Sequence, residues 1–205
     1  MARQSSRRLW AAKLDGKGLP AALATPLMTA AVRPHGLLLG IDPSLRGCGF
    51  AVVDAGRGGR LRLVASRTLK LSTKLSMVQC LGAIARATSE MLDAHVVTHV
   101  AVEETIYVQN FRTAQILGAA RGAAIGTAAA RDLPVAEYPP LRIKQAVAGF
   151  GRASKEQVAK QMQALLGLPE ALSFDESDAA AVAVCHAYTW RGGAIAAPEA
   201  PTSHG

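Results

Sequence analysis

The stretch that decides the fold is residues 37–53, LLLGIDPSLRGCGFAVV. Two apolar runs are separated by a turn that contains proline, serine and glycine, which is the pattern of two strands joined in a tight hairpin. The strands are expected over residues 36–41 and 49–53. Asp42 directly follows the first run, so the hairpin places a carboxylate at the end of a buried strand.

Asp42 allows two interpretations. In the functional one, its carboxylate binds a metal ion at the strand end, and the glycines of the turn let a phosphate approach the backbone closely. In the structural one, Asp42 only stabilises the turn of the hairpin. Actin-like ATPases also begin with a strand, an aspartate and a glycine-rich hairpin, so this stretch alone does not decide the class of protein.

The periodicity of the following residues extends the hairpin into a mixed sheet. Residues 61–71 alternate as a third strand, which completes a meander. Two more strands, at 96–103 and 134–138, each follow a helix, which implies right-handed crossovers and parallel pairing. The expected helices cover 72–94 (N-cap Ser72 or Thr73), 110–131, 141–148 and 175–190, and Ser154 and Gln157 have capping-box spacing. The fold class is therefore α/β, with a five-stranded mixed sheet flanked by helices.

Glu103 is a second acid at a strand end. It follows the apolar run of residues 98–102 directly, and Glu104 comes next. The pleat sends neighbouring side chains to opposite faces, so only one of the two can join Asp42. We choose Glu103 because it ends the run. An acid in this position is by itself more often structural, and its value lies in the combination with the other acids.

Asp175 and Asp178 stand three residues apart at the start of a helix rich in alanine and valine, so they share one helical face. Asp175 is alternatively an ordinary N-cap. Asp178 lies among apolar residues, where an unpaired charge costs free energy, so a metal ion or a basic group is expected beside it. Carboxylates from separate elements are the donors that Mg²⁺ prefers, which indicates metal-dependent phosphoryl transfer.

The composition bounds the class of protein. The 205 residues are half hydrophobic, which is enough for one core, and no apolar run is long enough to span a bilayer, so we expect a soluble protein without a membrane partner. The net charge of +8 favours a polyanionic partner, but residues 1–35 hold six of the 23 basic groups and a single acid. The charge therefore supports nucleic-acid binding only weakly.

The chain divides into three expected regions: a basic flexible extension at 1–35, a nuclease domain at 36–191 and a disordered tail at 192–205. The three cysteines show no CxxC spacing, which indicates neither disulfides nor a zinc site and favours the cytoplasm. The arginine- and serine-rich start also resembles an organelle transit peptide, so an organellar location is the alternative.

Five motifs together resemble the RuvC family of Holliday-junction resolvases, in the ribonuclease H-like superfamily. The match runs from about Leu37 to Tyr188. The motifs are GIDPSLR at 40–46, AVEE at 101–104, GAARG at 118–122, KQAV at 144–147 and DESDAAAVA at 175–183. Each motif is weak alone, but their order and spacing are specific. The resemblance implies a ribonuclease H-like fold and the catalytic, metal-binding acids Asp42, Glu103, Asp175 and Asp178.

The resemblance also implies which basic residues meet DNA. Lys144 and Lys155 occupy basic positions of the family near the cleft, where they would touch phosphates or stabilise developing charge. Arg46 and Arg112, with Arg121, would add contacts to the DNA backbone, although arginines on helix faces are usually only solvated.

The family places an aromatic wedge a few residues after the strand acid, where it stacks into the opened junction. Ile106 occupies that approximate place in this chain, and Tyr107 follows it. Stacking on bases contributes on the order of 1 to 3 kcal/mol, part of which an aliphatic wedge could supply. Both residues are therefore candidates for DNA contact.

The implied activity is that of a crossover junction endodeoxyribonuclease, which makes paired symmetric nicks in four-way junction DNA during recombination and repair. We predict hydrolysis with two Mg²⁺ ions per subunit, for which Mn²⁺ substitutes. Two symmetric cuts imply a homodimer. A branch-migration helicase complex similar to RuvA and RuvB is the expected further partner.

Some alternatives stay open. The helix rich in small residues at 113–126 is either a dimer interface or a helix packed on its own sheet. A ribonuclease H-like nuclease that acts on another branched DNA or on RNA would show much the same motifs. An actin-like phosphotransferase or ATPase shares the strand, the aspartate and the glycine-rich hairpin, but usually needs two such domains.

Overall fold

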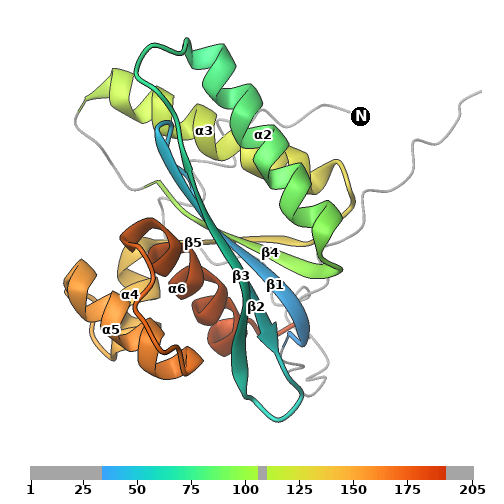
Figure 1. Cartoon of the computed structure of the whole chain (residues 1–205), viewed down its shortest axis with the longest axis vertical. Helices are drawn as coiled ribbons and strands as arrows, with labels where there is room; N and C mark the ends of the chain where they lie inside the picture. Colours follow the sequence, from blue (N-terminus) through green and yellow to red (C-terminus); the bar gives the residue numbers. More distant parts are fainter. Residues whose placement is uncertain (1–33, 106–109, 193–205) are drawn as a thin grey trace, which may run out of the picture. The chain divides into compact units, whose positions relative to one another are not determined.

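The computed structural model describes residues 34–105 and 110–192, which contain a five-stranded sheet with the strand order β3-β2-β1-β4-β5 (Figure 1). β2 is antiparallel to both of its neighbours, whereas β4 is parallel to β1 and to β5. The expected meander followed by parallel strands is confirmed. The strands are β1 (Gly36–Asp42), β2 (Gly47–Ala55), β3 (Leu61–Lys70), β4 (Val97–Glu103) and β5 (Val135–Tyr138).

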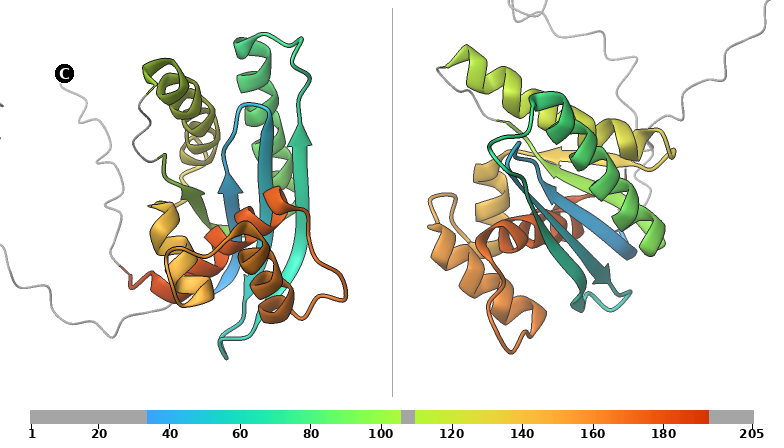
Figure 2. Two further views of the ribbon diagram at one scale, coloured as in Figure 1. Left: turned by 90° about the vertical axis from the view of Figure 1, so that its left-hand side faces the viewer. Right: turned by 45° about the horizontal axis from the view of Figure 1, so that its top comes forward.

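Helices cover both faces of the sheet, as Figures 1 and 2 show. One face carries α2 (Met77–Ala94) and α3 (Phe111–Ala129), the helices of the two parallel crossovers. The other face carries α4 (Pro140–Ala148), α5 (Lys155–Leu166) and α6 (Phe174–Thr189). The sheet is therefore buried on both sides, which explains why its central strands are apolar throughout.

The pleat of β1 divides its side chains between two cores. Leu38 belongs to the core under α4, α5 and α6, whereas Leu39 and Ile41 belong to the core under α2 and α3. All three side chains are fully buried. Asp42 follows Ile41 and so points to the α6 side, because successive side chains alternate. The alternation of one apolar strand thus fixes the face on which its terminal acid stands.

The start of α2 differs from the sequence-based expectation. Ser76, and not Ser72 or Thr73, is the N-cap, because Ser76 and Gln79 form a capping box that satisfies two backbone donors. Residues 72–75 form a turn instead, and Leu75 N–H donates to the carbonyl of Ser72 over 3.2 Å. The expected helix is therefore right, but its start is four residues too early.

Capping boxes also set the starts of α5 and α6. The expected box of Ser154 and Gln157 is confirmed. α6 begins after Ser173, whose side chain accepts from the Glu176 N–H, so the interpretation of Asp175 as the N-cap is wrong. Asp175 lies in the first turn with its carboxylate not used for capping, which leaves that group for other chemistry.

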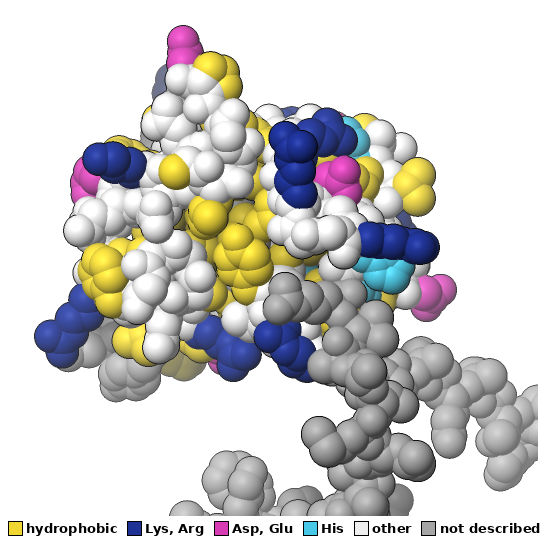
Figure 3. Space-filling view, turned by 90° about the horizontal axis from the view of Figure 1, so that it is seen from below, with side chains coloured by type: hydrophobic (Ala, Val, Ile, Leu, Met, Phe, Trp, Pro, Cys, Tyr) yellow, Lys and Arg dark blue, Asp and Glu magenta, His cyan; other side chains and the backbone are white. Residues whose placement is uncertain are grey.

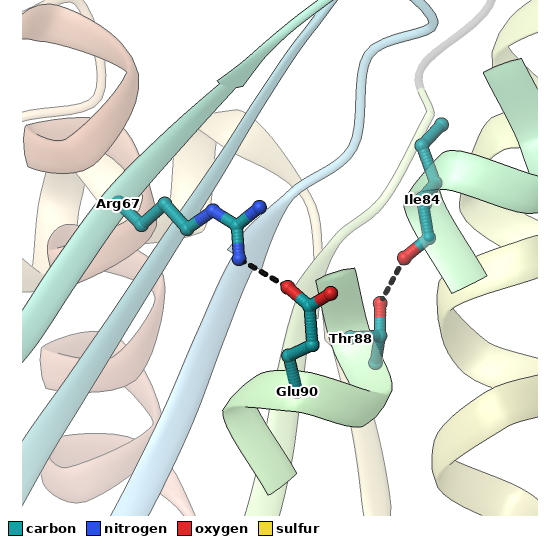
Figure 4. A network of polar contacts seen from close by, with 4 residues as sticks. All are labelled: Arg67, Ile84, Thr88 and Glu90. Atoms are coloured by element: carbon teal, nitrogen blue, oxygen red, sulfur yellow. Dashed lines mark hydrogen bonds and ion pairs between the residues drawn. The ribbon is translucent and has the colours of Figure 1, made fainter. Parts of the chain in front are cut away.

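Polar contacts attach α2 to the sheet, as Figure 4 shows. The Arg67 guanidinium on β3 lies 2.5 Å from the Glu90 carboxylate on α2. Within α2, the buried hydroxyl of Thr88 donates to the Ile84 carbonyl over 2.9 Å. The Thr88 hydroxyl thus has a partner, and α2 can present an otherwise apolar face to the sheet.

α3 has two faces made of small residues. Ala120, Ala124 and Ala128 are fully buried in the core with α2 and the sheet. Glycines recur at every fourth position from Gly118 to Gly126, and a methyl group on any of them would meet no heavy atom within 4 Å. The alanine face therefore packs on its own domain, while the glycine face is open among the described residues.

A partly buried aromatic cluster joins β4, β5 and the end of α6. The Tyr138 hydroxyl lies 2.8 Å from Nδ1 of His186, and the imidazoles of His186 and His99 are edge-on with centroids 5.2 Å apart. Trp190 packs against both rings. Burial lowers the pKa of His186 to about 4, so its ring is neutral near pH 7. The cluster is therefore an uncharged part of the core at neutral pH.

Figure 3 shows the end of the domain on which the β2–β3 turn lies, where apolar side chains are visible between lysine and arginine side chains. A cavity of about 510 Å³ is lined there by residues such as Gly56, Arg57 and Tyr188, and none of the four acids lines it. No helix within the described ranges is both long and apolar enough to cross a bilayer.

Candidate active site

Parallel pairing of β1 and β4 brings Asp42 and Glu103 side by side. Ile41 pairs with Val102, and each is followed by one of the two acids. The side chains of Ile41 and Val102 lie in the core under α2 and α3, so both acids point to the α6 side. Glu104 follows the end of β4 and is exposed. The structure therefore places Glu103 beside Asp42 on the face to which the pleat assigned it.

Three of the four predicted acids line one cavity of about 170 Å³: Asp42, Glu103 and Asp178. Asp175 does not line it. This residue lies one helical turn earlier on α6, close to Gly47, where a methyl group would be 3.4 Å from the Asp175 Oδ2 atom. Asp175 is still near enough for its charge to raise the pKa of Asp42. The four acids thus form a group of three with a fourth at its border.

Two glycines let α6 lie very close to the sheet. A methyl group on Gly40 would overlap the carbonyl oxygen of Ala179, and one on Gly49 would overlap the carbonyl oxygen of Asp175. The helix backbone occupies the space beside Gly40 and Gly49. Their effect is to hold the acids of α6 against the strand that ends in Asp42. The approach of a phosphate to the glycine of the turn, Gly47, stays a prediction.

The cavity holds more negative charge than its surroundings neutralise. Burial, followed by repulsion from Asp178, raises the pKa of Asp42 to about 7. Burial, followed by repulsion from Asp42, raises the pKa of Glu103 to about 8. Lys155 lowers both pKa values but does not cancel the increase. Closely spaced, half-buried carboxylates with raised pKa values are typical of catalytic and metal-binding centres.

Two lysines face the acids. The Lys155 Nζ atom lies 3.0 Å from Oδ2 of Asp178, and this hydrogen bond raises the pKa of Lys155. Asp178 was expected to need a metal ion or a basic group, and the lysine supplies the latter. Lys144 lines the same cavity and takes part in none of the ion pairs between described residues. Both predicted DNA-binding lysines are thus beside the acids.

The arginines lie further away and are engaged to different degrees. Arg46 donates to the Ser72 and Leu75 carbonyls, so its guanidinium holds the β1–β2 turn to the segment before α2. Arg121 forms an ion pair with Glu137. Arg112 makes no ion pair with a described residue. Neither Arg46 nor Arg112 is neutralised by a described carboxylate, but only Arg46 is held in place by hydrogen bonds to described residues.

Ile106 and Tyr107, the two candidate wedge residues, lie outside the described residues. The same holds for the predicted N-terminal extension up to residue 33 and for the predicted tail from residue 193. Their proposed roles therefore stay predictions.

The donor set fits a hard divalent cation. Asp42, Glu103 and Asp178 offer carboxylate oxygens, and a cation would offset the repulsion that raises two of their pKa values. Among the described residues, no three acidic, histidine or cysteine side chains already surround one point closely enough to hold a metal ion. An oxygen of Asp178 is bound to Lys155 instead. A cation would therefore compete with Lys155 for Asp178.

Sequence reasoning found the acids and lysines but missed the residues that position them. Gly40 and Gly49 lie within the quoted motif, yet a glycine in a strand signals a close approach without saying what approaches. The anchoring of Arg46 was also missed, because its acceptors are backbone carbonyls 26 and 29 residues away. Only the folded structure could reveal both.

Comparisons with known proteins show the family to which the chain belongs. The family model described as crossover junction endodeoxyribonuclease RuvC matches residues 38–186. The crossover junction endodeoxyribonuclease RuvC of Halorhodospira halophila is 44% identical over 151 residues, which is 74% of this chain and 89% of that protein.

Two solved structures are also similar. Thermus thermophilus RuvC in complex with Holliday junction substrate has a TM-score of 0.70 at 34% identity, covering 75% of this chain and 94% of that one. The yeast mitochondrial Holliday junction resolvase Ydc2 has a TM-score of 0.56 at 8% identity, covering 78% of this chain and 82% of that one, which indicates a shared fold alone.

The matched segment contains nearly all of β1, all of β4 and most of α6, the three elements that supply the acids. The fold is thus the ribonuclease H-like fold that the motifs implied. The chain belongs to the RuvC family of crossover junction endodeoxyribonucleases.

Proposed function

We propose that this chain resolves Holliday junctions by paired symmetric nicks and that the cavity lined by Asp42, Glu103 and Asp178 is its active centre. One observation carries this assignment: three acids distant in sequence share a cavity with Lys144 and Lys155. Metal ions held by such acids, next to cations that attract a phosphodiester, are how metal-dependent nucleases are built. Membership of the family supplies the reaction class, which is metal-dependent cleavage of junction DNA.

The cofactors in this proposal are two Mg²⁺ ions per subunit, and Mn²⁺ would substitute because it too accepts oxygen donors. Asp42, Glu103, Asp175 and Asp178 would hold the ions, since Asp178 and Asp175 approach Asp42 closely enough to raise its pKa. When bound, such ions lower the pKa of a water molecule and stabilise charge on the leaving oxygen. The acids hold the ions in place, and no side chain needs to act as a covalent nucleophile.

The lysines bind and orient the DNA phosphate in this proposal. Lys144 has no carboxylate partner among the described residues, so its charge attracts a phosphate without breaking an ion pair. Lys155 is shared with Asp178 and becomes available when a cation takes over that carboxylate. Ile106 and Tyr107 are proposed as the wedge, on the basis of their position three and four residues after Glu103 in the sequence.

A homodimer is the proposed functional unit, because two symmetric nicks need two active centres. The glycine face of α3, from Gly118 to Gly126, supports this proposal, since it leaves room for a second helix to approach closely. A branch-migration helicase complex similar to RuvA and RuvB, acting in the cytoplasm, is the proposed further partner.

The test compares the parent chain with Asp42→Asn on a synthetic mobile four-way junction in Mg²⁺. Loss of the Asp42 carboxylate should abolish cutting, while the lysines should keep junction binding within about threefold. Linear duplex and an RNA–DNA hybrid are the alternative substrates. Equal cutting by Asp42→Asn and the parent would overturn the site, and preference for either linear substrate would overturn the junction specificity.

A further inference from the structure

A separate cavity lies between the start of α2, the start of α3 and the β1–β2 turn. We call it the α2–α3 pocket. Its volume of about 530 Å³ lies within the range of about 300 to 1,000 Å³ that is typical of small-molecule sites. It is lined by Leu45, Arg46, Met77, Arg112, Gln115 and Ile116.

The α2–α3 pocket lies close to the cleft that holds the acids. An intermediate cavity of about 280 Å³ is lined by the two strand acids and also by Ser44 and Leu117. Leu45 and Ile116, their neighbours in sequence, line the α2–α3 pocket. β4 ends and α3 begins on the left of Figure 1, the side that faces the viewer in the left panel of Figure 2. A strand bound at the acids can therefore extend along this side to the pocket.

The lining of the α2–α3 pocket suits a nucleotide. Leu45, Met77 and Ile116 offer apolar surface, and Met77 is 40% exposed. Gln115 adds an amide that can both donate to and accept from a base edge. Arg112 adds a positive charge that no described carboxylate neutralises. Apolar contact, one amide and one cation are the groups that recognise the face, edge and phosphate of a nucleotide.

One wall of the pocket is held by hydrogen bonds, and an exposed aromatic residue precedes Arg112 in the sequence. Arg46 is fixed by its bonds to the Ser72 and Leu75 carbonyls, so that wall does not collapse when the pocket is empty. Phe111 lies one helical turn before Gln115 and is 76% exposed. An exposed ring beside a basic cavity offers a stacking surface for a second base.

We propose that the α2–α3 pocket binds one unstacked nucleotide of the cut strand, a short distance from the scissile phosphate, and that Gln115 reads its base. This inference rests on the proposed function, because it needs a DNA strand at the acids. The proposed occupant is an unpaired base at the branch point of an opened junction, because the pocket lies close to the cleft and Arg112 adds a positive charge. The pocket thereby determines which sequence is cut.

The experiment uses the full chain and junctions that carry one abasic site at each of the positions flanking the cut. The parent chain should cut one of these junctions about fivefold more slowly or worse, because the missing base removes stacking and hydrogen bonding. Junctions with each of the four bases at that position should then show a preference. Equal cutting of all abasic and intact junctions would overturn the inference while leaving the proposed function intact.

Two variants and a control complete the test. Gln115→Ala should reduce the base preference at that position to less than about twofold and leave the rate on the abasic junction unchanged. Arg112→Gln should weaken binding of all junctions alike. The slope of the logarithm of the binding constant against the logarithm of salt concentration should decrease by the amount expected for about one lost phosphate contact. Arg86→Gln, an exposed charge on α2 outside the pocket, should match the parent. A base preference that persists in Gln115→Ala would refute the reading role, and a chain that cuts no junction would refute the proposed function as well.

Discussion

The ammonium group of Lys155 lies 3.0 Å from the carboxylate of Asp178, the acid of α6 that shares a cavity with the two strand acids. The exposed fractions of the two side chains are 60% and 17%, so a largely solvated cation reaches into a largely buried acidic group. This contact is the one ion pair between described residues that line the cavity. Its removal should affect every acid nearby.

Lys155→Gln should make cleavage more dependent on high pH. Lys155 lowers the pKa values of Asp42 and Glu103, so both rise further when its charge is lost. Protons then compete better with the metal ion. At pH 7 and limiting Mg²⁺ we expect a decrease in cleavage rate of about tenfold or more, partly recovered at pH 9. Lys160→Gln, an exposed lysine on the same helix, is the control, and an equal defect at both pH values would contradict this explanation.

Asp42→Asn should stabilise the metal-free protein at pH 8 while abolishing cleavage. The folded state raises the pKa of Asp42 from 3.8 to about 7, so ionisation costs stability as the pH rises through that interval. A neutral amide of the same size removes this cost, which we expect to be on the order of 4 kcal/mol. Urea denaturation in EDTA measures it. A variant less stable than the parent at pH 8 would show that the repulsion is not significant.

Gly49→Ala should displace α6 and reduce cleavage by more than tenfold. The added methyl group would overlap the Asp175 carbonyl oxygen, which belongs to backbone and cannot rotate away. Overpacking of this kind costs about 1 to 3 kcal/mol. Gly58→Ala is the matched control, because nothing lies within 4 Å of the added group. Both variants are compared by urea denaturation and by cleavage at saturating Mg²⁺, and parent-like cleavage by Gly49→Ala would show that α6 is not held in place by this contact.

His186 should make stability decrease in acid. Its folded pKa of about 4 is below the usual histidine value of 6.5, so the unfolded state binds more protons between these values. Stability is therefore fully present above pH 6.5 and is lost as the pH falls towards 4, by up to roughly 3 kcal/mol. His186→Gln cannot titrate, so its unfolding free energy should vary less between pH 6.5 and 4.5. Parallel curves for parent and variant would assign the effect to other groups.

Gly122→Leu should weaken dimer formation without unfolding the subunit. Gly122 is exposed in the centre of the glycine face, and a Cβ atom added there would meet no heavy atom of the described residues within 4 Å. Analytical ultracentrifugation should show a larger monomer fraction, and paired nicking should decrease more than single nicking. Gly58→Ala, a glycine variant outside α3, serves as the control here too. A dimer unaffected by Gly122→Leu would place the interface elsewhere.

The fold could be predicted from sequence because its central pattern is local. The apolar runs that end at Asp42 and Glu103 define two buried strands, and the pleat decides their faces without knowledge of the rest of the chain. The spacing of Asp175 and Asp178 likewise follows from helical geometry alone. These regularities depend on periods of two and three to four residues, which a sequence displays directly.

Other features of the site depended on competition or on distant contacts. Ser173 and Ser76 are the N-caps because each has a Glu or Gln partner three residues later. Ser72, the N-cap expected from sequence for α2, has no such partner. The role of Gly40 became visible only when α6 lay across it. Neither the choice among caps nor a close backbone contact leaves a periodic signal.

The close seating of α6 on Gly40 and Gly49 has a consequence for how this nuclease loses activity. A helix whose carbonyls touch strand backbone cannot open locally without separating the two layers, so its amide hydrogens should exchange with solvent only through global unfolding. Asp175 and Asp178, which α6 carries, should therefore lose their positions in the site together. Heat inactivation should therefore coincide with the cooperative melting of the whole domain, with no inactive intermediate that keeps the sheet but has lost the metal ligands of α6.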